Sequence, residues 1–234
     1  SFVSRGLGDV YKRQIMSLFK KSKILVIGDA MLDKYSFGTI DRISPEAPVP
    51  VLKIKEEIMK PGGAANVAAN VRSLGIETNL ISNIGKDING KFLTKLIKSQ
   101  KINLISDSLE NFKTTVKTRV ISQNQQLIRI DDDSINNLKN KNIFTKSTEK
   151  LIKNSDAIII SDYNKGSIKN ISNLINIANK NNKPIFIDPK GDDFSHYKGA
   201  FAITPNLKEF VKIVGYCKNH KEIISKAKSL SKKL

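Results

Sequence analysis

The stretch Ile24-Leu-Val-Ile-Gly28, followed at once by Asp29-Ala-Met-Leu-Asp33, decides the fold class. An apolar run that stops at a carboxylate is typical of a strand buried on both faces of a sheet. Further runs of this kind alternate with segments that carry apolar residues at helical spacing. The strand-like runs are 24–28, 78–82, 157–161, 184–187 and 200–204, and the helix-like segments are 64–74, 90–99, 147–153 and 168–181. This alternation predicts an α/β fold with a mostly parallel sheet flanked by helices.

Two stretches depart from this rhythm. Residues 49–54, and residues 113–122 together with 125–131, alternate apolar and polar side chains, as strands do when one face is wet. They predict a small antiparallel sheet beside the main one, a lid with strands within about residues 34–60 and 112–131. Such a flap closes over a substrate and excludes water from the reaction.

The composition excludes several classes of protein. The chain has 234 residues, of which 39% are hydrophobic, enough for a sizeable core. Cys217 is the only cysteine and the histidines are His196 and His220, so neither a disulfide framework nor a Cys/His zinc cluster can form. No apolar run approaches the roughly 18 to 20 residues of a membrane span. We therefore expect a cytoplasmic protein that does not insert into a membrane.

The charge is strongly basic, with 40 Lys and Arg against 22 Asp and Glu, a net charge of +18. This balance raises the alternative of a basic nucleic-acid-binding protein, whose affinity would fall steeply with salt. The lysines, however, are spread along nearly every polar stretch and do not form a block with interleaved aromatic residues. The distribution favours a solvated, lysine-rich surface with no specific nucleic-acid partner.

The two ends of the sequence carry separate expectations. Residues 1–15 show no helix or strand period and no signal-peptide architecture, and they resemble a translated adaptor sequence. We expect the domain to begin at Met16. Residues 220–234 predict a helix with no stop signal after it, so we expect 16–234 to be an incomplete domain.

Carboxylates, lysines and an amide follow four of the predicted strands, where parallel sheets place their ligand sites. Such a mixture of groups suits a sugar or polyol, a metal and a polyphosphate. The residues are Asp29 and Asp33, Asp162 and Lys165, Asp188 and Lys190, and Asn206 and Glu209. Structural readings stay open for several of them. Asp29 and Asp33 fit an ordinary loop, residues 188–191 fit a turn, and Asn206 with Glu209 has the spacing of a helix capping box.

The segment Lys60-Pro-Gly62-Gly63-Ala-Ala-Asn66-Val-Ala-Ala-Asn70 is the strongest single motif. Two glycines before a helix of small residues let the backbone approach a ligand closely, and a helix N-terminus favours negative or hydroxyl-rich groups. Close helix packing through the alanines is the alternative explanation. Neither G-x-x-x-x-G-K-[ST] nor G-x-G-x-x-G occurs, which excludes the usual P-loop and dinucleotide-binding motifs.

Seven segments taken together resemble the ribokinase-like (PfkB) sugar kinases, and within them the branch that phosphorylates D-glycero-beta-D-manno-heptose 7-phosphate. Their presence in the same order makes the resemblance specific, and RISPEAPVP and NQQLIRID point to the heptose branch. The segments are VIGDAMLDKY (26–35), RISPEAPVPV (42–51), PGGAANVAANVRSLG (61–75), NQQLIRID (124–131), SDYNKG (161–166), DPKG (188–191) and TPNLKEF (204–210).

The resemblance implies transfer of the γ-phosphoryl group of ATP, with Mg²⁺, to the 1-hydroxyl of the heptose 7-phosphate, in ADP-heptose synthesis for lipopolysaccharide core. It also implies roles for individual residues. Asp33, Gly62, Gly63 and Asn66 would hold the sugar, and Arg129 the sugar or its 7-phosphate. Asn206, Leu207, Lys208 and Glu209 would bind the nucleotide, Glu209 through Mg²⁺ and its waters, while Asp162, Lys165, Asp188 and Lys190 would line the phosphate path.

The sequence departs from the family at the catalytic base. That base is the Asp of a Gly-Ala-Gly-Asp motif, which does not occur in these residues and is expected beyond Leu234. We therefore expect weak sugar binding and poor turnover from these residues alone. The resemblance also implies a homodimer formed through the lid. Another PfkB-type sugar kinase, or a catalytically silent sugar sensor, remains an alternative.

Overall fold

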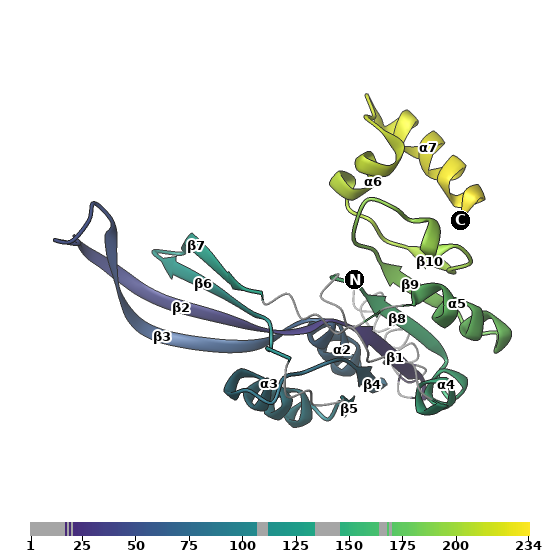
Figure 1. Cartoon of the computed structure of the whole chain (residues 1–234), viewed down its shortest axis with the longest axis horizontal. Helices are drawn as coiled ribbons and strands as arrows, with labels where there is room; N and C mark the ends of the chain where they lie inside the picture. The colour runs from purple at the N-terminus through teal and green to yellow at the C-terminus, as the bar shows by residue number, and fades with distance from the viewer. Residues whose placement is uncertain are drawn as a thin grey trace, which may run out of the picture.

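The computed structural model describes residues 17, 19, 21–106, 112–133, 146–163, 168 and 170–234. Residues 1–15 and Lys165, for which the sequence makes specific predictions, lie outside this part of the chain. The described residues form two sheets (Figure 1). Sheet A has the strand order β10-β9-β8-β1-β4-β5, and sheet B has the order β3-β2-β6-β7.

Sheet A is parallel throughout, which confirms the predicted α/β class. Its strands are β1 (Lys23–Gly28), β4 (Glu77–Ile81), β5 (Asn103–Ile105), β8 (Ala157–Ser161), β9 (Ile185–Asp188) and β10 (Ala202–Ile203). The helices are α2 (Ala64–Ser73), α3 (Ile88–Ser99), α4 (Lys146–Lys153), α5 (Ile171–Lys180), α6 (Leu207–Val214) and α7 (His220–Lys233), with a short 3-10 helix η1 (Ser195–Tyr197).

The core lies on both faces of sheet A, as the apolar run in β1 requires. Leu25 and Ile27 pack with residues of α4, α5 and η1, whereas Val26 between them packs with residues of α2 and α3. Successive side chains of a strand point to opposite faces, so one strand contributes to both core clusters. None of the described helices is long and apolar enough to cross a membrane.

Sheet B contains the antiparallel strand pairs predicted for the lid, and the sheet as a whole is mixed. Its strands are β2 (Ala30–Ile43), β3 (Pro50–Gly63), β6 (Val116–Ser122) and β7 (Gln125–Asp132). The β2–β3 and β6–β7 pairs are antiparallel, but β2 and β6 run parallel at the centre of the sheet. The parallel pair arises because β6 does not follow β2 or β3 through a hairpin; α2 and α3 intervene and return the chain to the same end.

The segment after β1 is also a strand and not a loop. Asp29 alone separates β1 in sheet A from β2 in sheet B. The predicted strand 49–54 overlaps only the first residues of the longer β3, which begins at Pro50. Polar residues on both faces of β2, such as Lys34 and Tyr35, hide the alternation that would have indicated a strand.

Sheet B extends from sheet A as an arm, and α6 and α7 lie on the other side of the molecule (Figure 1). Asp87, the N-cap of α3, joins the base of this arm to α3. Its Oδ1 accepts from Gly90 N and its Oδ2 from Thr114 N, both at 2.7 Å. Thr114 Oγ1 in turn accepts from Gly85 N at 3.1 Å. The carboxylate therefore caps a helix and also fixes the entry to β6.

Candidate functional site

One face of sheet B gathers charged side chains, and we call it the charged face. Residues paired across adjacent strands share a face of the sheet. Asp33 in β2 lies opposite Lys60 in β3 and Lys117 in β6, and Tyr35 lies opposite Arg119, which lies opposite Arg129 in β7. The charged face thus includes Asp33, Tyr35, Lys60, Lys117, Arg119, Arg129 and Asp131, and farther out Glu56, which lies opposite Phe37.

An ion pair between Asp33 and Arg119 lies at the centre of this face. Arg119 Nη1 is 2.7 Å from Asp33 Oδ1, and the side chains are only 23% and 17% exposed. The hydrogen bond to Asp33 raises the pKa of Arg119 above its ordinary value, so the guanidinium stays charged. The guanidinium also lies over the ring of Tyr35, 5.2 Å from its centroid. This half-buried pair fixes the orientation of both side chains.

Gly62 and Gly63 make room for the Asp33 carboxylate. A Cβ atom on Gly62 would come within 2.5 Å of Asp33 Oδ2, so this position excludes any larger residue unless Asp33 moves. Gly63 has φ +55°, a conformation that favours glycine, and it turns the chain from β3 into α2. The structure therefore brings Asp33 and Gly62 together, as the predicted sugar site requires.

Asn66 is placed differently from the other predicted sugar residues. It is exposed in the first turn of α2 and lines a hollow beside β3, together with Met59, Lys60 and Pro61. Within the described ranges, no hydrogen bond joins Asn66 to Asp33. Any role in sugar binding would have to act from the edge of the site.

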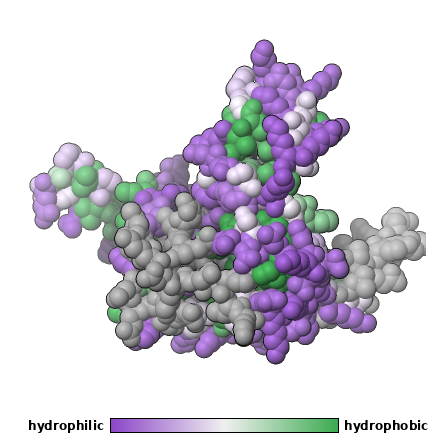
Figure 2. Space-filling model, turned by 45° about the vertical axis from the view of Figure 1, so that its right-hand side comes forward, coloured by the Kyte–Doolittle hydropathy of each residue, from purple (hydrophilic) through white to green (hydrophobic). Residues whose placement is uncertain are grey.

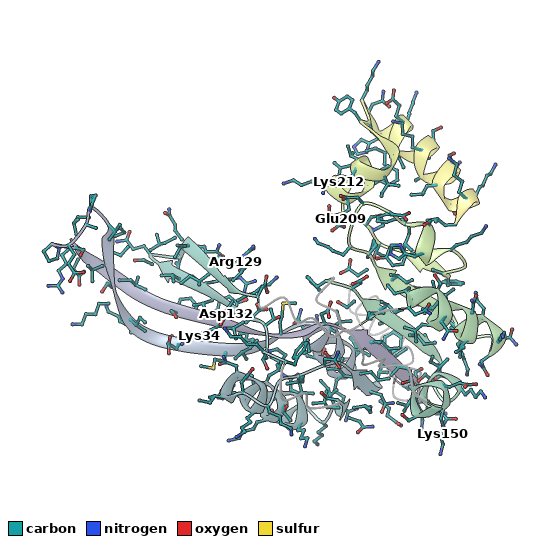
Figure 3. All side chains as sticks on the ribbon, viewed as in Figure 1. Lys34, Arg129, Asp132, Lys150, Glu209 and Lys212 are labelled. Carbon is teal, nitrogen blue, oxygen red and sulfur yellow. The ribbon has the colours of Figure 1, made fainter. Side chains whose placement is uncertain are left out.

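Arg129 lies on the charged face but is engaged by a neighbour (Figure 3). It forms a two-pronged pair with Asp131, with Nε to Oδ1 at 2.8 Å and Nη2 to Oδ2 at 3.0 Å. Arg119, which the sequence analysis missed, contacts Asp33 instead. Arg119 could have been found as a cationic residue on the strand that pairs with β2. That pairing can be considered only once residues 30–43 are recognised as a strand.

A second group of polar residues surrounds a pocket at the carboxyl ends of β8, β9 and β10. The pocket is lined by Asp162, Tyr163, Asp188, Pro189, Lys190, Thr204, Pro205, Asn206 and Glu209. β8 and β9 pair through Ser161 and Asp188, which brings their strand ends side by side. Of the described residues predicted for the phosphate path and for nucleotide binding, the structure thus assembles all but Leu207 and Lys208.

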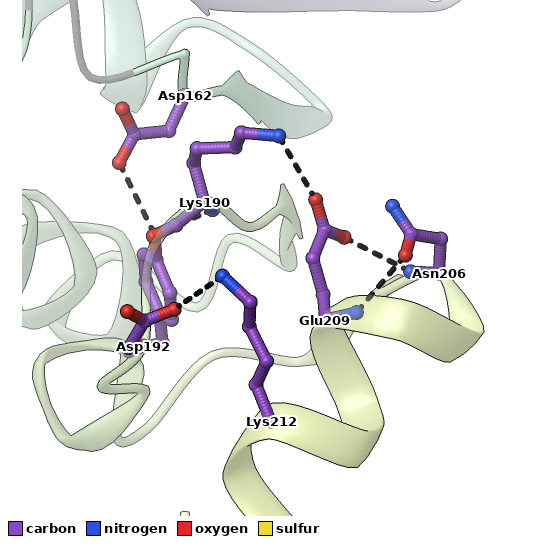
Figure 4. A network of polar contacts seen from close by, with 7 residues as sticks. Asp162, Lys190, Asp192, Asn206, Glu209 and Lys212 are labelled. Carbon is purple, nitrogen blue, oxygen red and sulfur yellow. Dashed lines mark hydrogen bonds and ion pairs between the residues drawn. The ribbon is translucent and has the colours of Figure 1, made fainter.

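The capping box at the start of α6 is confirmed, and it contributes to this pocket. Asn206 Oδ1 accepts from Glu209 N, and Glu209 Oε2 accepts from Asn206 N, both at 3.0 Å. The other carboxylate oxygen, Glu209 Oε1, lies 3.2 Å from Lys190 Nζ (Figure 4). One carboxylate oxygen of Glu209 therefore caps the N-terminus of α6, and the other faces Lys190 in the pocket. Leu207, in contrast, is 58% exposed and lines an apolar hollow between α6 and α7, and Lys208 is also exposed.

Tyr163 joins the charged face to the strand-end pocket. It lines the pocket, and Lys117 Nζ of the charged face lies 5.4 Å from the centroid of its ring. Burial raises the pKa of Tyr163, and the charges of Asp188 in the pocket and Asp33 on the charged face raise it further. The two groups of residues therefore form one continuous site.

Comparison with known proteins decides the family. Residues 21–234 match the model of the pfkB family carbohydrate kinases. This chain belongs to that family. The matched region includes both sheets and every residue placed in the site above.

Curated relatives of this pfkB-family chain include the "Bifunctional protein HldE" of Haemophilus influenzae strain PittEE. The two are 46% identical over 218 residues, which cover 93% of this chain and 46% of the relative. The protein of the same name from Psychromonas ingrahamii is 43% identical over 217 residues, covering 92% of this chain and 46% of the relative. The chain spans about half the length of these relatives.

Solved structures share the fold at low sequence identity. The ribokinase of Arabidopsis thaliana, solved with ribose and ATP, aligns with a TM-score of 0.72 and 17% identity, over 90% of this chain and 69% of that one. The tetrameric inhibited form of phosphofructokinase-2 from Escherichia coli aligns with a TM-score of 0.65 and 17% identity, over 90% and 70%. The ribokinase-like fold predicted from sequence is confirmed.

The strand-end pocket of this pfkB-family chain is acidic. Burial raises the pKa of Asp188, and the negative charges of Glu209 and Asp162 raise it further, against an opposing effect of Lys190. Clustered carboxylates of this kind gain from a nearby cation. Among the described residues, no group of three or more Asp, Glu, His or Cys side chains could hold a metal ion directly. A metal here would be held largely by water and by a ligand's oxygens, an arrangement that Mg²⁺ favours.

The raised pKa of Asp188 makes a prediction about stability. Because the folded-state pKa lies above the unfolded value, the stability from this carboxyl is present at low pH and is lost as pH rises through the folded pKa. We expect Asp188→Asn to raise the melting temperature at pH 7, and the gain to vanish below the unfolded pKa. Thermal melts across pH measure this.

Asp193 provides a control of opposite sign. Hydrogen bonds from Ser195 N and Oγ lower its pKa, so Asp193→Asn should slightly destabilise the protein at pH 7, and this effect should fade as pH falls through the folded pKa. A lower melting temperature for Asp188→Asn than for the parent protein at pH 7 would contradict the prediction.

Proposed function

We propose that this chain binds ATP and D-glycero-beta-D-manno-heptose 7-phosphate for phosphoryl transfer to the 1-hydroxyl, giving the 1,7-bisphosphate of ADP-heptose and lipopolysaccharide core synthesis. The observation that carries the proposal is the continuous site, in which the cationic charged face meets the acidic strand-end pocket at Tyr163. The identity of 43 to 46% to proteins named HldE supports the choice of sugar.

Asp33 is proposed to accept hydrogen bonds from the sugar hydroxyls. Its half-buried carboxylate rests against Gly62, where the backbone comes close enough for a sugar to contact both. Gly63, at the start of α2, and Asn66, one turn along at the edge of the site, are proposed to complete this sugar subsite. Sugar hydroxyl groups can donate hydrogen bonds to the Asp33 carboxylate. With the Asn66 amide they can both donate and accept hydrogen bonds.

Arg119 and Arg129 are proposed to bind the 7-phosphate. Each guanidinium offers five N–H donors, and Arg119 uses Nη1 for Asp33. On the charged face, Lys60, Lys117, Arg119 and Arg129 oppose Asp33, Glu56 and Asp131, which leaves one positive charge (4 − 3) on the described part of the face. This balance favours a phosphorylated sugar over a neutral one, since a phosphate group is a dianion near neutral pH.

The strand-end pocket is proposed to hold the nucleotide phosphates. Lys190 would neutralise phosphate charge, with Asp162, Asp188 and the predicted Lys165 along the same path. Glu209 Oε1 faces the pocket and is proposed to bind waters of Mg²⁺. Asn206, Leu207 and Lys208, at the start of α6, are proposed to contact the nucleotide. Magnesium, when bound, would offset the negative charge between the phosphates and these carboxylates.

Phosphoryl transfer depends mainly on positioning and on charge stabilisation. The residues above bind and orient the two substrates. The base that removes the proton of the 1-hydroxyl is proposed to be the Asp of a Gly-Ala-Gly-Asp motif, which is not among these 234 residues. Direct binding is therefore the primary test for this chain.

The test is a calorimetric titration with a panel of sugars in the presence of Mg²⁺ and a non-hydrolysable ATP analogue. We expect heptose 7-phosphate to bind more tightly than fructose 6-phosphate, ribose or unphosphorylated heptose. Tighter binding of another sugar phosphate would support a pfkB-family kinase of different specificity. No binding of any sugar or of the nucleotide analogue would refute the proposal.

Arg119 should distinguish phosphorylated from unphosphorylated sugar. We expect Arg119→Gln to weaken heptose 7-phosphate binding by about tenfold or more, because a charge-assisted fork is lost. Binding of unphosphorylated heptose should change less. The matched control is Arg42→Gln, an exposed arginine at the outer end of β2. Equal losses for both sugars would show that Arg119 acts only through Asp33.

Sheet B is also proposed to form the interface of a homodimer. β7 lies at one edge of the sheet, and Ile128 and Ile130 on the face opposite the charged face are 54% and 52% exposed. Apolar residues also gather at the outer end of the arm (Figure 2). An edge strand with an exposed apolar row suits pairing with a second copy of the chain.

The dimer makes a prediction about mass in solution. Light scattering should give twice the 26.1 kDa chain mass for the parent protein. The double variant Ile128→Glu, Ile130→Glu should give the monomer mass, since buried charges oppose the interface. Ile88→Glu is the control, because Ile88 is 84% exposed but lies in α3, outside sheet B. A monomeric parent protein, or a double variant that stays dimeric, would contradict this interface.

A further inference from the structure

Tyr197 is a buried residue whose hydroxyl contacts two residues that line the strand-end pocket, although Tyr197 itself does not line it. It comes from η1, its side chain is fully buried, and its ring packs against Phe194 with the ring centroids 5.6 Å apart. A hydroxyl buried this deeply is costly unless it is hydrogen-bonded. Its hydrogen-bond partners therefore indicate what the hydroxyl is for.

These partners are two residues of the pocket. The Tyr197 hydroxyl accepts from Lys190 N at 3.1 Å, and it lies 3.1 Å from both Asp162 Oδ2 and the Lys190 carbonyl oxygen. A phenol has one proton, so the two oxygens share it as acceptors. Burial raises the pKa of Tyr197 far above its ordinary value, and the hydroxyl remains a donor at every physiological pH.

The contacts fix the base of the Lys190 side chain. Both the N–H and the C=O of Lys190 meet the same hydroxyl, so the backbone of this residue is held from two sides. The Lys190 side chain is half-exposed, and a free lysine of this kind has many rotamers. Held at its base, it extends to Glu209 Oε1 at 3.2 Å.

The result is a continuous set of hydrogen bonds across the pocket (Figure 4). It runs from Asp162 after β8, through Tyr197 to Lys190 after β9, and on to Glu209 and Asn206 at the start of α6. Packing alone does not account for this arrangement. A phenylalanine would fill the same space, but it would remove the acceptor of the Lys190 N–H and the hydrogen bond to Asp162 Oδ2.

We propose that Tyr197 is a positioning residue of the nucleotide pocket, whose hydroxyl sets the relative orientation of Asp162 and Lys190. This inference rests on the proposed nucleotide role of that pocket. Tyr197 does not touch the pocket's ligand space itself, since it is absent from the pocket lining. It acts through the two residues that it holds.

The test is Tyr197→Phe, which keeps the ring and removes only the hydroxyl. We expect Mg·ATP to bind about tenfold more weakly to this variant. The reason is that the hydrogen bonds that orient Asp162 and Lys190 are lost with the hydroxyl. Binding of heptose 7-phosphate should be unchanged, because the charged face lies outside the network. Tyr216→Phe is the matched control, since Tyr216 is 75% exposed.

A second measurement uses backbone amide hydrogen exchange by NMR. In the parent protein the Lys190 amide should be protected, and in Tyr197→Phe its exchange should be faster by about tenfold or more while amides of β1 stay protected. This comparison separates a local loss of positioning from general unfolding. An unprotected Lys190 amide in the parent protein would overturn the inference.

The ligand measurements distinguish the two proposals. If the parent protein does not bind Mg·ATP, the nucleotide site is wrong and this inference falls with it. If the parent binds Mg·ATP and Tyr197→Phe binds it equally well, or loses both ligands to the same extent, only the positioning role is wrong. If Mg·ATP binding falls selectively but heptose 7-phosphate is not the preferred sugar, the positioning role stands and the sugar assignment fails.

Discussion

The two sheets and the site between them depend on the hydrogen bonds of one buried residue, Asp29. Its N–H donates to Ser161 O at the end of β8, and its C=O accepts from Ala64 N at the start of α2. Its side-chain Oδ2 accepts from Tyr163 N at 2.9 Å. Asp29 is 2% exposed, and its hydrogen bonds join the end of β1 to two other segments at the point where the chain leaves one sheet for the other. An aspartate suits this position because a charged acceptor forms strong hydrogen bonds with backbone N–H groups.

The geometry of the proposed sugar subsite follows from this junction. Because Ala30 pairs with Gly63 at the start of sheet B, Asp33 emerges on the charged face a few residues further along, beside Gly62. The two glycines thus have structural reasons as well as a proposed functional one. Gly62 leaves room for a carboxylate, and Gly63 adopts a positive φ that a residue with a side chain would strain to reach. The Gly62-Gly63 motif suggests a backbone that comes close to a ligand. In this structure Gly62 already lies close to the Asp33 carboxylate, so part of the motif is explained by that contact.

The sequence patterns correctly predicted the features of the structure that depend on residues close together in the chain. The strand 157–161 has the predicted bounds, and the capping box of Asn206 and Glu209 forms as its spacing indicates. The parallel pairing of β2 with β6 escaped prediction because it joins segments about 80 residues apart, and so did the Asp33–Arg119 pair that depends on it. Tyr197 escaped because a lone tyrosine in a short 3-10 helix has no periodicity. Its partners become apparent only when β8 and β9 lie side by side.

The site also shows why net charge was a poor guide to function. The residues behind the charge of +18 are spread along the whole sequence, whereas the site contains two regions of opposite character. Among the described residues, the charged face has more cations than carboxylates, and the strand-end pocket has three carboxylates, Asp162, Asp188 and Glu209, beside Lys190. A cationic surface suits an anionic sugar phosphate, and an acidic pocket suits a nucleotide only when a divalent cation accompanies it. The local separation of charge therefore suits the proposed metal-bound nucleotide on one side and the proposed phosphorylated sugar on the other, which the overall composition does not reveal.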